Sequence, residues 1–224
     1  MSVEIAYCPN VAARLSRLRA LYARGDPNIV LAVMEVPSGA VQDFGVRYPP
    51  GECATPSLDE RCHFWDALLA ERCAIADDSI PSAYLTEMDQ GLYGGLVGGQ
   101  AHFVADPATG WISSMLFPLL ENWDGFEKLR ADFGGEWGRR YQAQLAAFVR
   151  AAAGKFGVSH FILIDSLNFV FELFGAGRTY AELLDNPDKV RRAIDFAYDL
   201  NAKVQDMFFE RVPLLAGGTC SNAG

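Results

Sequence analysis

Three aspartates follow short apolar segments of this sequence, in positions where carboxylates could take part in catalysis. Asp77 and Asp78 come directly after the apolar stretch 73–76, and Asp165 ends the apolar run 161–164. In parallel α/β folds ligands bind beyond the carboxyl ends of the strands, where a carboxylate can stabilise a developing cation, accept a proton or bind a metal ion. We therefore take Asp77 and Asp78 as candidate catalytic residues and Asp165 as a candidate substrate-binding residue. The alternative is that these aspartates cap the helices that follow.

Two polar side chains near these aspartates are further candidates for substrate binding. Asn168 lies three residues after Asp165 and could form a hydrogen bond to a substrate. Tyr84 lies just beyond Asp78 and could line a pocket. A local turn explains Asn168 equally well, and core packing explains Tyr84 equally well.

Several other chemistries lack the residues that they need. The three histidines do not have the spacing of metal ligands, and the five cysteines, an odd number without close CxxC pairs, are typical of reduced thiols rather than a disulfide framework or a zinc ribbon. We therefore predict no metal site. The glycines do not form GxGxxG, GxxxxGK[ST] or GxSxG motifs, so neither nucleotide binding nor serine hydrolysis is supported.

Composition excludes further classes of protein. Half of the 224 residues are hydrophobic and 21% are charged, which is usual for a folded protein with a substantial core. The net charge of −9 argues against a nucleic-acid binder, which needs a basic face. The first 25 residues contain no unbroken apolar stretch of signal-peptide type, and no window approaches the roughly 20 apolar residues needed to span a membrane. We expect a cytoplasmic protein that acts on a small molecule, without nucleic-acid or membrane partners.

Alternating strand and helix patterns extend along the whole chain. Short apolar runs predict buried strands over 28–37, 73–80 and 160–165, and a fourth strand that begins at 213–216. Ser57 begins a capping box, apolar residues recur at helical spacing from Glu136 to about Phe156, and Asn186 precedes a proline, so each of these predicts a helix. The segment 37–56, rich in glycine and proline, predicts a loop, and 101–105 with 111–115 predicts a hairpin.

This order of elements predicts an α/β fold with a parallel sheet. About four core strands are visible, whereas a closed (β/α)8 barrel needs eight. The prediction is therefore an incomplete TIM-type barrel formed by one domain, residues 1–224. Since such a sheet has an open edge, we expect a second copy of the chain or the missing C-terminal half of the barrel as a partner, and an isolated chain that oligomerises or is marginally stable.

Three segments in this order resemble the uroporphyrinogen decarboxylase superfamily. They are the loop 76–81, the segment 110–115 that is followed by Trp123, and the glycine turn, short helix and long-helix start of 175–190. The resemblance implies a (β/α)8 barrel, a lyase of porphyrin biosynthesis that removes carboxyl groups from a tetrapyrrole or a related small carboxylated substrate, and no cofactor. It matches Asp78 with the aspartate that binds the pyrrole nitrogens, and Phe171 with a tyrosine of the substrate pocket.

The sequence departs from the decarboxylase pattern at two places. The arginine-rich signature expected after the first strand is absent from 34–40, and Phe171 has no hydroxyl group. A corrinoid-dependent methyltransferase of the same superfamily, with zinc and a corrinoid as cofactors, is therefore an alternative function. A non-catalytic half-barrel that serves as a binding or assembly module is a second alternative, and it predicts no turnover.

Overall fold

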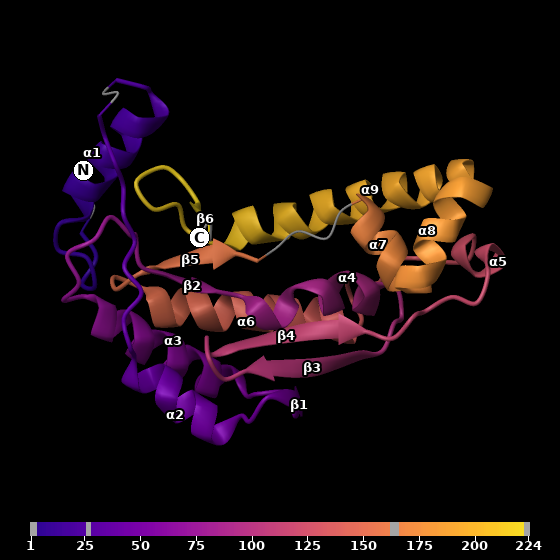
Figure 1. The fold of residues 1–224 in the computed structure, drawn as a ribbon, viewed down its shortest axis with the longest axis horizontal. Coiled ribbons are helices and arrows are strands. Elements are labelled where there is room, and N and C mark those ends of the chain that lie inside the picture. The colour runs from indigo at the N-terminus through magenta and orange to yellow at the C-terminus, as the bar shows by residue number, and fades with distance from the viewer. Residues whose placement is uncertain (1–3, 26–27, 162–165, 222–224) are drawn as a thin grey trace.

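The structure is a computed structural model that describes residues 4–25, 28–161 and 166–221. Within these residues helices predominate, and the strands are short (Figure 1). In chain order the elements are α1 (Val11–Tyr22), α2 (Gly39–Arg47), β1 (Gly51–Cys53), α3 (Leu58–Arg72), β2 (Ser82–Tyr84), the 3₁₀ helix η1 (Thr86–Met88), α4 (Gln90–Leu96), β3 (Ala101–Asp106), β4 (Trp111–Leu116), α5 (Trp123–Phe126), α6 (Glu136–Ala152), β5 (Gly157–His160), α7 (Ser166–Phe174), α8 (Ala176–Asp185), α9 (Pro187–Arg211) and β6 (Cys220–Ser221).

An antiparallel sheet with the strand order β1-β3-β4 contains the predicted hairpin. The hairpin is confirmed, and each strand is one residue longer than predicted, since Asp106 pairs with Trp111 and Leu116 pairs with Ala101. Gly110 closes the turn at a φ of 78°, a left-handed conformation that favours glycine. Helix α4 packs on this sheet, and α6 packs on α4.

A separate parallel sheet has the order β2-β5-β6. Ser82 pairs with Gly157, and Ser159 pairs with Cys220. The strands of this sheet do not lie where the sequence predicted them. β2 begins after Pro81 instead of ending before it, and β5 ends at His160, where a strand was expected to begin. Residues 213–216 form no strand and precede β6, and 162–165 lie outside the described residues.

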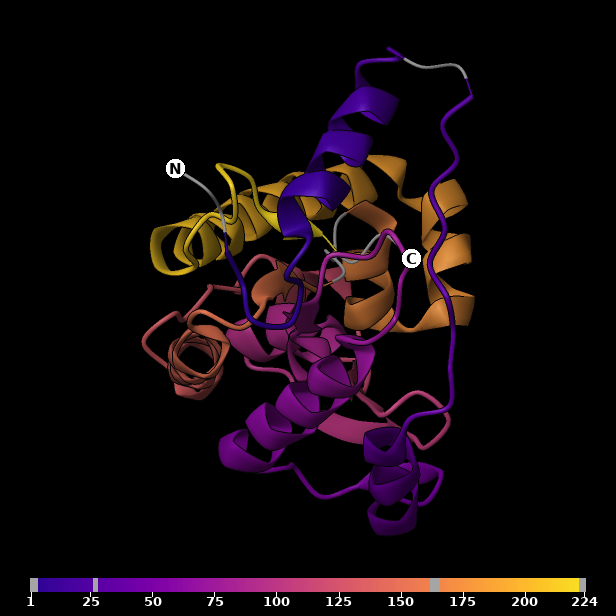
Figure 2. The ribbon, with the colours of Figure 1, turned by 90° about the vertical axis from the view of Figure 1, so that its left-hand side faces the viewer.

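The expected incomplete (β/α)8 barrel is wrong as a description of this fold. The described residues form a mixed α/β arrangement with one antiparallel and one parallel sheet, and no barrel. The predicted first strand, 28–37, is an extended segment without regular structure. Figure 2 shows it running along one side of the molecule from α1 to α2. Its valines stay in solvent, with Val30 75% and Val33 63% exposed, so the apolar run does not mark a core strand.

The helix signals of the sequence were more reliable than the strand signals. The Oγ atom of Ser57 accepts a hydrogen bond from the Glu60 backbone N–H at 3.2 Å, so the predicted cap of α3 is confirmed. α6 and α9 are also confirmed, although α6 ends at Ala152, four residues earlier than predicted. The predicted loop 37–56 is wrong in part because α2 forms there, with Ser38 as its N-cap.

One main hydrophobic core joins the two sheets to α3, α4, α6, α7 and α9. Aromatic residues contribute much of it, and Tyr93, Tyr141, Phe169 and Phe208 are completely buried. A smaller cluster around Cys8 and Val11 anchors α1. Among the described residues, none of the helices is both long and apolar enough to cross a membrane.

Candidate functional site

The carboxyl ends of β2 and β5 lead into helices that pack together. β2 ends at Tyr84, and the chain continues through η1 into α4. β5 ends at His160, and α7 begins at Ser166. Helix α7 packs against α4, so the segments that follow the two parallel strands lie side by side. In parallel α/β sheets ligands bind in this region, which makes it the first place to search for a site.

Asp77, a predicted catalytic residue, lies at the centre of an ionic network. Its side chain is 1% exposed and contacts Arg14 at 3.3 Å and Arg72 at 2.8 Å. It also accepts hydrogen bonds from the Ser79 hydroxyl at 2.6 Å and from the Met34 backbone N–H at 3.0 Å. Burial alone would raise the pKa of Asp77, but these hydrogen bonds and the charge of Arg72 outweigh burial and lower the pKa.

Asp78 has the same kind of environment nearer to solvent. Arg17 binds it through two nitrogen atoms, at 2.6 and 3.2 Å, and the Ala32 backbone N–H donates to it at 3.0 Å. The hydrogen bond from Arg17 lowers the pKa of Asp78. Asp77 and Asp78 therefore attach the extended segment 28–37 to α1 and α3. Their predicted role in catalysis stays a prediction.

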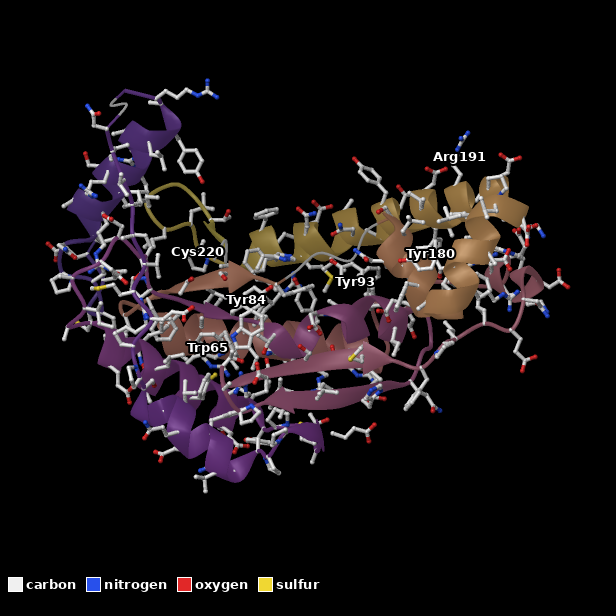
Figure 3. The ribbon with its side chains drawn as sticks, viewed as in Figure 1. Trp65, Tyr84, Tyr93, Tyr180, Arg191 and Cys220 are labelled. Atoms are coloured by element: carbon white, nitrogen blue, oxygen red, sulfur yellow. The ribbon has the colours of Figure 1, made fainter. Side chains whose placement is uncertain are left out.

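The predicted substrate-binding residues are placed in different surroundings. Asn168 and Phe171 lie three residues apart on α7, and both are exposed, Phe171 by 44%. Tyr84 is buried in the core, where its ring lies 5.2 Å from that of Trp111, and Figure 3 shows it beneath the parallel sheet. Asp165 lies outside the described residues. The structure thus brings Asn168 and Phe171 together on one helix and separates them from Tyr84.

Helix α7 also carries a buried carboxyl group, that of Glu172. Glu172 lies four residues after Asn168, one helical turn away on the same side. It is 7% exposed, and within the described structure its Oε2 atom has no hydrogen-bond partner. Burial, assisted by the negative charge of Asp89, raises the pKa of Glu172 to about 8. At neutral pH this carboxyl group is therefore mostly protonated.

Asp89, whose charge raises the pKa of Glu172, is fixed by hydrogen bonds from Ser114 of the antiparallel sheet. It is 9% exposed and directly precedes α4. Its Oδ1 atom accepts hydrogen bonds from the backbone N–H of Ser114 at 2.8 Å and from the Ser114 hydroxyl at 2.9 Å. These two donors stabilise the ionised form of Asp89. The segment after β2 thus contributes a carboxylate, and the helix after β5 contributes a neutral carboxyl group.

Two carboxyl groups in environments that favour different protonation states can divide acid and base roles between them. Glu172 is suited to donate a proton, and Asp89 keeps that proton in place by its charge. Sequence reasoning missed Glu172, although a signal was present. It is the single charged residue in the mostly apolar helix sequence SLNFVFELF, and this isolation is the signal that the sequence contains.

His160 ends β5 but is less suited to proton transfer. Burial lowers its pKa, and its ring lies 4.4 Å from the ring of Phe161 and 4.6 Å from that of Phe208. Among the residues that the structure describes, no group of three or more histidine, cysteine, aspartate or glutamate side chains could hold a metal ion.

Comparisons with known proteins give this site no precedent. No family model, no curated protein and no solved structure matches the chain. The resemblance to the uroporphyrinogen decarboxylase superfamily therefore rests on the sequence segments alone, and the site has to be interpreted from its own geometry.

Proposed function

We propose that this chain performs lyase-type chemistry on a small carboxylated substrate, with Glu172 as the proton donor. The observation that carries the proposal is a buried carboxyl group, without a hydrogen-bond partner at Oε2 among the described residues, on the helix that follows a parallel strand. A neutral carboxyl group in an apolar site is a donor that works at neutral pH.

The reaction is the loss of carbon dioxide. The bond between the substrate carbon and its carboxylate breaks, the electron pair stays on that carbon, and carbon dioxide leaves. Glu172 then gives its proton to the carbon and becomes a carboxylate, which regains a proton from water. The nearby negative charge of Asp89 favours this reprotonation because it makes an ionised Glu172 unfavourable.

The choice of substrate class has two supports. Asn168 is exposed one helical turn before Glu172, and its amide can bind the polar groups of a substrate. The sequence resemblance favours a carboxylated tetrapyrrole or pyrrole, because the decarboxylases of that superfamily remove carbon dioxide from such a substrate. The proposal does not require a barrel.

The test measures carbon dioxide released from carboxyl-labelled uroporphyrinogen, coproporphyrinogen and simple pyrrole carboxylates. We expect turnover by the wild-type chain and a loss of roughly 100-fold in Glu172→Gln, the usual contribution of a general acid. Glu52→Gln is the matched control, because Glu52 is exposed on β1. Release of carbon dioxide at an equal rate by Glu172→Gln, or no release from any of these compounds, would refute the proposal.

A further inference from the structure

The extended segment 28–37 is hydrogen-bonded to the rest of the chain along one edge. Hydrogen bonds of 2.8–3.0 Å reach the backbone of Val30, Ala32 and Met34, and their partners are Arg17, Arg72, Asp77 and Asp78. Ala32 uses both its N–H and its C=O in this way, and so does Met34. In a β-strand the N–H and C=O of one residue point to the same side, and those of the next residue point to the opposite side. Contacts at alternate residues are therefore those of a strand that is bound along a single edge.

The opposite edge of this segment is open. It belongs to Leu31, Val33 and Glu35, and among the described residues no hydrogen bond reaches the backbone N–H or C=O of these three. Val33 and Glu35 are exposed, and Figure 2 shows the segment on one side of the molecule, where it belongs to neither sheet. A row of unpaired N–H and C=O groups is an edge to which another strand can add.

Apolar side chains of the segment lie in solvent beside this edge. Val30 is 75% exposed, Val33 63%, Val36 45% and Met34 43%. Single exposed apolar residues are usual on protein surfaces, but a row of them on an unpaired strand is typical of a surface that binds a partner.

The backbone of the open edge is complementary to itself in an antiparallel pair. When Val33 lies opposite the same residue of a second copy, Leu31 lies opposite Glu35 on both sides of the symmetry axis. Each of the three residues then donates its N–H to the residue opposite and accepts through its C=O, because all three occupy hydrogen-bonded positions of the ladder. Pro37 has no N–H to donate, so the ladder ends there.

The side chains of this register also match. Val30 lies opposite Val36 of the second copy, and Ala32 lies opposite Met34, so one face of the paired strands contains apolar side chains only. On the other face two copies of Val33 meet at the symmetry axis. Contacts of this kind between β-branched and apolar residues stabilise antiparallel pairs.

Charge also favours this edge as the place where two copies meet. Each copy has a net charge of −9, so most contacts between copies bring negative charges together. Within 28–37 the single charged residue is Glu35. In the antiparallel register the two Glu35 residues are about 13 Å apart along the ladder, which exceeds the Debye length of about 8 Å at physiological ionic strength.

We propose that the segment 28–37 is the interface of a symmetric homodimer, in which the open edges of two copies join as an antiparallel ladder centred on Val33. The other edge of each strand is already bound by side chains and backbone of its own chain, so no third copy can add and the assembly closes at two chains. The interface is independent of the reaction proposed for Glu172, because α7 has no part in it.

Sedimentation velocity of the full chain at increasing concentration tests the proposal. A single pair of short strands is small compared with the roughly 1,200–2,000 Å² that stable interfaces bury, so the dimer should be weak. We expect a change from monomer to dimer between about 1 µM and about 500 µM, with a Kd of about 100 µM or tighter and no larger species.

Substitutions of Val33 locate the ladder. Val33→Pro removes the central N–H, which has no partner in the single chain, so the variant should keep the stability of the wild type in urea but stay monomeric. Val33→Thr is the matched control. It retains the N–H and the β-branched shape, so it should dimerise with a Kd within about threefold of the wild-type value.

Two double variants test the register, and they decide the question if Val33→Pro fails to fold. Val30→Lys with Val36→Glu places opposite charges across the ladder, whereas Val30→Lys with Val36→Lys places like charges there. The first should dimerise at least about tenfold more tightly than the second. A wild-type chain that stays monomeric at about 500 µM, a Val33→Pro variant that dimerises as the wild type does, or equal behaviour of the two double variants would each overturn the proposal.

Discussion

The protonation state of Glu172 can be tested through protein stability, without knowledge of the substrate. The variant Glu172→Gln has nearly the same shape as a neutral glutamic acid but does not titrate. In the wild type the folded state holds a proton that the unfolded state releases, because folding raises the pKa of Glu172 from 4.5 to about 8. A raised folded-state pKa contributes stability below the unfolded value, and this contribution is lost as the pH rises.

The window and the size of the effect follow from these two pKa values. Between pH 4.5 and about 8 the folded chain keeps its proton while the unfolded chain has lost it. Each pH unit in this window lowers the free energy of unfolding of the wild type by about 1.4 kcal/mol. From about pH 5.5 to about pH 7.5 the wild type should therefore lose about 3 kcal/mol relative to Glu172→Gln.

Urea unfolding of the two proteins at both pH values measures this difference directly. Glu52→Gln is the control, because its exposed carboxyl group should show nearly the same difference from the wild type at both pH values. If the difference between Glu172→Gln and the wild type is also the same at both pH values, Glu172 is ionised in the folded chain. That result would refute its assignment as a neutral proton donor.

Two further predictions concern the packing of the fold, and urea unfolding checks both. Asp77→Asn should lower the free energy of unfolding by about 3 kcal/mol, since it removes the charge from a carboxylate that is 1% exposed between two arginines. Asp78→Asn should have a much smaller effect because its arginine partner is 49% exposed, and equal effects would contradict this ranking. Gly95→Ala should destabilise the chain by about 2 kcal/mol, because the added Cβ would lie 2.3 Å from Cγ of Trp137. Gly177→Ala, with nothing within 4 Å of the new Cβ, should instead stabilise α8 by up to about 1 kcal/mol, and a loss of stability there would refute the packing analysis.

Local chemistry of the sequence was sufficient to predict α3, α6 and α9. Ser57 caps α3 because its hydroxyl satisfies a backbone N–H in the first turn, and this requires only the residues of that turn. The hairpin could be predicted in the same way, since Asp106 accepts hydrogen bonds from Ala108 and Thr109 within the turn itself. Interactions of this kind are encoded within about five residues.

The strands could not be predicted in the same way because a strand exists through its partner. The segment 28–37 has the apolar composition of a buried strand, but in the described structure side chains and single backbone groups hold it instead of a ladder. Arg17 and Asp78 bind it at Val30 and Ala32, and Asp77 and Arg72 bind it at Met34. No pattern of apolar residues distinguishes this arrangement from a sheet.

The same contrast separates Glu172 from Arg61. Glu172 had a local signal, because it is the single charged residue in a nine-residue helix of mostly apolar residues. Arg61 had none, because α3 contains other charged residues and the sequence does not show which of them faces inward. Its burial appears only when Glu87, Gln144 and the ring of Phe64 are in place. A buried cation whose donors exceed its protein partners is a property of the tertiary structure, and only the fold shows it.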